Sequence, residues 1–215
     1  MRKYLTEFTG TLLFVLSIGL IVTPGPRPLA PMMIGSALMV LVYMGGHVSG
    51  AHYNPAVSFA VFLRGKLPTG ELLRYVAAQI LGGTLGAYLS YVVLEQTFGP
   101  APADTAATVT VLLVEGIFTF MLALVVLNVA VAKETQGNSF YGLAIGFTIA
   151  VAVFAGGPIS GGVFNPAVGT GASLIHAFIG GGDLTKLWLY LVGPLAGGAL
   201  AAFVFKLQHP LEPSV

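Results

Sequence analysis

Six stretches of the chain are apolar over roughly 20 residues each, which is the length that an α-helix needs to cross a bilayer. They are Leu5–Val22, Pro31–Val48, Leu72–Leu94, Val109–Ala132, Phe140–Gly156 and Leu187–Leu207. Two shorter apolar segments, Pro55–Leu63 and Pro166–Ile175, would each be about 15 Å long as helices, half the thickness of the hydrocarbon. The pattern predicts an all-α membrane protein with six transmembrane helices and two re-entrant half-helices.

The same four residues open both short segments. They are Asn54-Pro55-Ala56-Val57 in one segment and Asn165-Pro166-Ala167-Val168 in the other. Asparagine is a favoured N-cap and proline suits the first helical position, so each string predicts the abrupt start of a helix. Inside a membrane, such a start is tolerated where it lines a cavity or is buried in protein. Two of them indicate a path for solutes across the membrane.

The chain contains one structural unit twice. A Glu-x-x-x-Thr element begins at Glu7 in the first span and returns at Glu115 in the fourth. The third span carries Gln79–Gly83, which matches Pro194–Gly198 in the sixth. Each unit holds three spans, an odd number, so the second copy must be inverted in the membrane. We therefore expect a single channel domain, 1–215, made of inverted repeats of roughly 1–100 and 101–215, with the solute path at their interface.

Composition supports the membrane assignment, since 56% of the residues are hydrophobic and only 8% are charged. The net charge of +1 argues against a nucleic-acid partner. The chain has no cysteine, and His47 and His52 lack a third ligand at a suitable spacing, so we expect no metal and no other cofactor. The expected partners are the lipid bilayer, water and small neutral solutes.

The basic residues set the orientation. With six spans, one side of the membrane carries Arg2, Lys3, Arg64, Lys66, Arg74, Lys133 and Lys206, and the other carries Arg27 and Lys186. The richer side is cytoplasmic by the positive-inside rule. We expect an integral, multi-pass protein with both termini in the cytoplasm, in the inner membrane of a prokaryotic cell.

Taken together, these elements resemble the aquaporin superfamily of water channels and glycerol facilitators. The resemblance covers nearly the whole chain and includes Ala78-Gln79 with its glycines and Val192-Gly193-Pro194. It implies a right-handed bundle with one pore per subunit, a homotetramer, and a passive channel rather than an enzyme. It also implies that departures from the family's pattern mark the selectivity of this chain.

The expected pore is lined by the two loops that lead into the half-helices. Each half-helix N-terminus carries roughly half a positive charge, and two of them at the midplane repel cations. Asn54 and Asn165 would cap these helices with their oxygens and offer their amide groups to the solute. Carbonyl groups of the loops would line the rest of the path, from Gly50, Ala51, His52 and Tyr53 on one side and from Gly161, Val163 and Phe164 on the other.

The expected selectivity filter departs from the family. Typical members have an arginine after the second Asn-Pro-Ala string, where this chain has Val168. The other three filter positions fall at Ile34, Val153 and Gly162. This filter offers no charge and no side-chain donor, so it should be wider and more apolar than a water filter. Glycerol, urea or a metalloid hydroxide such as arsenite are then plausible solutes.

Two glutamates within the spans need a role, and three other functions are compatible with parts of the sequence. Glu7 and Glu115 lie in apolar sequence, and we expect them to hold the re-entrant loops by hydrogen bonds rather than to relay protons. An ion-coupled transporter is an alternative, as is a water-selective aquaporin despite the missing arginine. A third alternative is an intramembrane enzyme, because Gly46–Gly50 nearly matches a Gly-x-Ser-Gly motif with Ser49 as the nucleophile. Ser160 repeats the position of Ser49 in the second unit, which indicates a structural role for both serines.

Overall fold

The structure, a computed structural model, describes residues 1–210, whose regular secondary structure is helical throughout. The helices are α1 (Arg2–Val22), α2 (Ala30–Ser49), α3 (Pro55–Leu63), α4 (Thr69–Leu94), α5 (Thr108–Val126), α6 (Tyr141–Ser160), α7 (Pro166–Ile179) and α8 (Leu189–Gln208). A π-helical turn, η1 (Leu127–Val131), extends α5, and a 3-10 turn, η2 (Lys133–Thr135), follows it. Among the described residues, six helices are long and apolar enough to cross a membrane: α1, α2, α4, α5 with η1, α6 and α8. The predicted all-α fold is confirmed.

Two predicted segments, the fifth span and the second half-helix, end four residues too early. The fifth span runs through Pro158 to Ser160, because a proline this close to a helix end removes only one backbone hydrogen bond. The second half-helix continues to Ile179 and ends before Gly180. Its last turn therefore includes His176, which the predicted segment left out.

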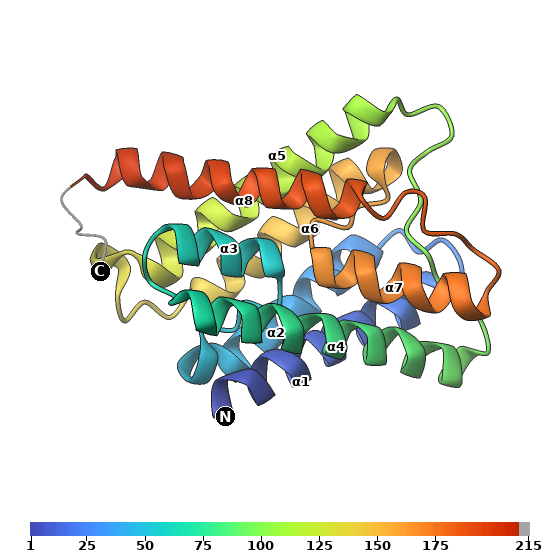
Figure 1. Cartoon of the computed structure of the whole chain (residues 1–215), viewed down its shortest axis with the longest axis horizontal. Coiled ribbons are helices and arrows are strands. Elements are labelled where there is room, and N and C mark those ends of the chain that lie inside the picture. Colours follow the sequence, from blue (N-terminus) through green and yellow to red (C-terminus); the bar gives the residue numbers. More distant parts are fainter. Residues whose placement is uncertain (211–215) are drawn as a thin grey trace.

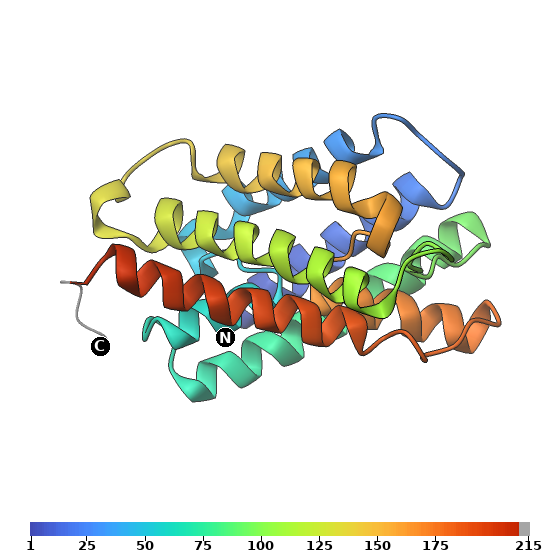
Figure 2. The ribbon, with the colours of Figure 1, turned by 90° about the horizontal axis from the view of Figure 1, so that it is seen from above.

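The half-length helices α3 and α7 lie end to end inside the bundle, with their N-termini at its centre (Figure 1). Each of them contacts both α4 and α8. Around them α1 packs on α4, α2 on α6 and α5 on α8. Figure 2 shows α5 lying between α6 and α8.

Close approach of these helices depends on glycines of α4 and α8. A Cβ atom on Gly83 of α4 would lie 2.7 Å from the carbonyl oxygen of Ala167, and one on Gly198 of α8 would lie 2.6 Å from that of Ala56. Neither distance leaves room for a methyl group. Each Asn-Pro-Ala string is therefore packed against a helix from the other half of the chain.

The helices α2 and α6 meet in a reciprocal contact. A Cβ atom on Gly35 would lie 2.5 Å from the carbonyl oxygen of Gly146, and one on Gly146 would lie 2.5 Å from that of Gly35. These glycines, like the first and last residues of α2 and α6, are 111 positions apart. Such reciprocity is what an inverted repeat requires at its two-fold axis.

The start of α1 and the end of α8 lie toward the same end of the bundle, at the left of Figure 1. We call this the terminal end. The loops 23–29, 95–107 and 180–188 lie at the opposite, distal end. The segments 64–68 and 132–140, which connect α3 to α4 and α5 to α6, lie toward the terminal end.

Candidate pore and its hydrogen-bonded loops

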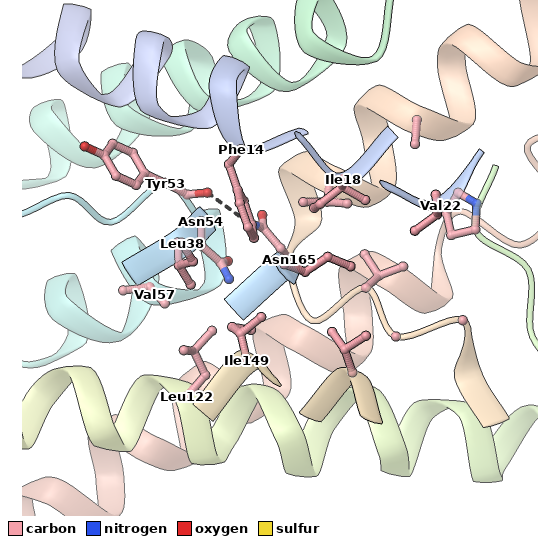
Figure 3. Close-up of a pocket in the computed structure, with 18 of the residues that line it drawn as sticks. Phe14, Ile18, Val22, Leu38, Tyr53, Asn54, Val57, Leu122, Ile149 and Asn165 are labelled. Carbon is pink, nitrogen blue, oxygen red and sulfur yellow. Dashed lines mark hydrogen bonds between the residues drawn. The ribbon is translucent and has the colours of Figure 1, made fainter. Parts of the chain in front are cut away.

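The two asparagines join the re-entrant loops at the centre of the molecule. Asn54 Oδ1 accepts from the N–H of Ala56 and Asn165 Oδ1 from that of Ala167, each at 2.9 Å, so both cap their helices. Asn54 Nδ2 donates to the carbonyl of Phe164, again at 2.9 Å. Asn165 Nδ2 donates to the carbonyl of Tyr53 at the same distance (Figure 3). An amide NH₂ group has two donors. Each asparagine therefore keeps one N–H for a solute.

Glu7 clamps the first loop. Its Oε1 accepts from Ser49 Oγ at 2.6 Å and from the N–H of His52 at 3.0 Å. Its Oε2 accepts from the N–H of Tyr53 at 2.7 Å and from Gln79 Nε2 at 2.8 Å. The side chain is completely buried. These donors replace the water that a buried carboxylate loses, so Glu7 does not reach toward the membrane surface.

Glu115 clamps the second loop in the same way. It accepts from Ser160 Oγ at 2.7 Å and from the N–H groups of Val163 and Phe164 at 3.0 and 2.6 Å. It too is completely buried. The clamps hold backbone that is otherwise unfavourable, because Tyr53 and Phe164 both have φ of 49°.

Two tyrosines that the sequence analysis did not select support the clamps. Tyr75 Oη donates to the carbonyl of Ser49 and Tyr190 Oη to that of Ser160, each at 2.8 Å. The sequence did contain a signal for them, because both belong to the internal repeat. Tyr75 precedes Gln79 by four residues, and Tyr190 precedes the matching Pro194 by four.

A hydrogen-bonded chain occurs in the first loop without a counterpart in the second. Gln79 Nε2 donates to Ser58 Oγ at 2.8 Å as well as to Glu7, and Ser58 Oγ lies 3.0 Å from His52 Nδ1. A hydroxyl group can accept two hydrogen bonds and donate one, so the contact between Ser58 Oγ and His52 Nδ1 fits either tautomer of the imidazole. Val163, Gly169 and Pro194 stand at the matching places of the second repeat.

A cavity of about 340 Å³ runs past the two asparagines. Its polar side is formed by the loop residues Ala51–Asn54 and Gly161–Val163, and its apolar side comes from α1, α2, α5 and α6 (Figure 3). All four expected filter residues line this cavity: Ile34, Val153, Gly162 and Val168. No carboxylate or other permanently charged side chain is among its described lining residues.

Several expected pore residues do not line the cavity. Gly50 and Phe164 are absent from its wall, because Gly50 ends α2 in a left-handed turn and the Phe164 ring packs on Phe118. Tyr53 faces the lumen only with its backbone, since its ring lies against Gly10 and Gly45 (Figure 3). The remaining members of the two strings are also buried in protein and set the helix starts: Pro55, Ala56, Pro166 and Ala167.

The sequence analysis missed one part of the wall. The segment Phe98–Ala101, in the loop between α4 and α5, lines the cavity near the distal end. Thr97 Oγ1 lies 2.8 Å from Nδ1 of His176, which ties this loop to the end of α7. No periodicity marks such a segment, so its place follows only from tertiary contacts.

Comparison with known proteins agrees with this geometry. The sequence model described as major intrinsic protein matches residues 1–205. The chain belongs to the major intrinsic protein family. Glycerol uptake facilitator protein-like 6 of Lactiplantibacillus plantarum is 33% identical over 221 residues, which cover 97% of this chain and 98% of that protein.

Plant relatives of this major intrinsic protein are longer than it is. Aquaporin NIP1-1 of Zea mays is 39% identical over 179 residues, which cover 80% of this chain but only 60% of the relative. The aquaglyceroporin from Plasmodium falciparum, known from an X-ray structure, superposes with a TM-score of 0.86 at 22% identity, covering 98% and 97% of the two chains. This likeness shows the shared fold.

Proposed function

We propose that this major intrinsic protein is a passive channel for water and small uncharged solutes. The observation that carries the proposal is the cavity, which passes two half-helix N-termini whose capping asparagines each keep a free N–H. The two helix N-termini repel cations, while neutral solutes meet hydrogen-bond donors and acceptors near the middle of the membrane.

The solute class follows from the lining. The loops Ala51–Asn54 and Gly161–Val163, together with the amide groups of Asn54 and Asn165, line one side of the cavity, and the opposite side is apolar. Small molecules with several hydroxyl donors on a compact apolar body match such a path. We therefore favour glycerol and metalloid hydroxides such as arsenite, with urea and water as further solutes. The printed name of the Lactiplantibacillus relative supports glycerol.

The finer features of this proposal are the orientation and the assembly. The terminal end is cytoplasmic by the positive-inside rule, and the functional unit is a homotetramer with one pore in each subunit. Chemical cross-linking of membranes, followed by mass analysis, tests the tetramer. The orientation is tested by introducing a single cysteine into loop 180–188 and measuring from which side of the membrane a reagent labels it. The chain has no cysteine of its own that would interfere.

The test of the channel itself is flux into proteoliposomes, followed by light scattering after an osmotic step. We expect glycerol, urea, arsenous acid and water to enter faster than into empty vesicles, without saturation and without dependence on an ion gradient. Saturable flux that requires a proton or sodium gradient would identify an ion-coupled transporter. Fast water flux with complete rejection of glycerol would identify a water-selective channel.

A further inference from the structure

The residues that line the cavity occur as matched pairs from the two repeats. At the offset of 111, the outer positions Ile34, Val153, Gly162 and Val168 correspond to Ile145, Val42, Ala51 and Val57. All eight residues line the cavity. We call the first four the outer ring and the second four the inner ring. The reciprocal contact between Gly35 and Gly146 places the two-fold axis of the repeats between them.

The rings differ in how open they are. All four inner-ring residues are buried, with at most 5% of the surface of each exposed. In the outer ring, Val153 and Gly162 are only partly buried. Ala51 also carries a methyl group where Gly162 has none, and beside it His52 stands where the outer loop has the smaller Val163.

The extent of the cavity points the same way. Beyond the outer ring, the described lining continues toward the distal end through Val22 and Phe98–Ala101. Toward the terminal end it stops at the level of the inner ring and His52, without reaching the cytoplasmic ends of α2 or α3 among the described residues. The cavity is therefore open through the outer ring and closes at the inner one.

We propose that the inner ring, Val42, Ala51, Val57 and Ile145, is the constriction that limits solute size in this channel. The proposal rests on the channel function proposed above and moves the size limit from the outer filter to its symmetry-related counterpart. Without an arginine at Val168, the outer ring has lost the large side chain that would narrow it. The side chain of His52 follows Ala51 of the inner ring in the wall of the cavity, so a solute reaches a polar group as it passes the narrowest point.

Matched valines of the two rings provide the test. Val57→Ala and Val168→Ala remove the same two methyl groups from repeat-related positions that are 2% and 5% exposed, so their effects on folding should be similar. Proteoliposomes with each variant are challenged with glycerol and with the larger polyol erythritol. Val57→Ala should raise the erythritol-to-glycerol permeability ratio roughly ten-fold, the discrimination that a methylene of pocket space supports. Val168→Ala should raise the ratio much less than Val57→Ala does, because the outer ring is already the more open of the two.

A second variant and a second measurement keep the outcomes separate. Ala51→Gly enlarges the inner ring at a residue with φ of 49°, where glycine is favoured, so it should fold and raise the ratio in the same direction. An experimental density map of the wild-type protein gives the lumen radius at both rings whether or not a solute passes. A larger effect of Val168→Ala, or a narrower outer ring in the map, overturns the proposal. Absence of any neutral flux through the wild type overturns the channel function instead.

Discussion

Replacing Glu115 tests whether the carboxylate clamps determine the shape of the pore. In Glu115→Gln the amide NH₂ takes the place of one carboxylate oxygen, so at least one of the N–H groups of Val163 and Phe164 faces a donor instead of an acceptor. An unsatisfied buried donor costs about 1–3 kcal/mol. In Glu115→Ala all three donors, including Ser160 Oγ, lose their acceptor, and the cost rises to about 3–9 kcal/mol, a large part of the stability of an ordinary domain.

Thr119→Val is the matched control. Thr119 lies one turn along α5 from Glu115, is completely buried, and its Oγ1 has no hydrogen-bond partner among the described residues. Its removal should therefore leave stability unchanged. In thermal unfolding of the purified protein in detergent, Glu115→Gln should lower the midpoint by roughly 2–12 °C, and Glu115→Ala by more. An unaltered midpoint for Glu115→Gln, or an equal loss in Thr119→Val, would refute the reasoning.

Three further predictions concern selectivity and packing. Val168→Arg should narrow the outer ring and reduce glycerol or arsenite flux more than water flux in proteoliposomes, and an unchanged ratio would show that the filter is assigned wrongly. Voltage-clamp recording of cells with the wild-type channel should show no sizeable cation current, because the two half-helix ends repel cations without the arginine; a cation current abolished by Val168→Arg would contradict this. Gly198→Ala should cost about 1–3 kcal/mol of stability and slow solute flux, since its methyl group would meet Ala56 O, whereas Gly70→Ala, with nothing within 4 Å, should be neutral in the same unfolding assay.

The amino-acid sequence by itself determined the class of the protein. Apolar runs of membrane length define the six spans, and Asn-Pro at the start of each short segment defines two helices that begin inside the membrane. Both are local properties, set by the transfer of side chains into lipid and by helix capping. The repeat, with Glu7 matching Glu115, then made an inverted arrangement necessary.

Only the tertiary structure decided which atoms face the lumen. Tyr53 and Phe164 follow the same pattern as their pore-lining neighbours, yet their rings point into protein, because glycines such as Gly10 and Gly156 leave room there. The partners of Glu7 and Glu115 come from residues more than 40 positions away. Likewise, the place of Phe98 in the wall depends on loop contacts. Local sequence sets where a helix begins, but the direction of a side chain depends on the space its distant neighbours leave, and packing alone decides that space.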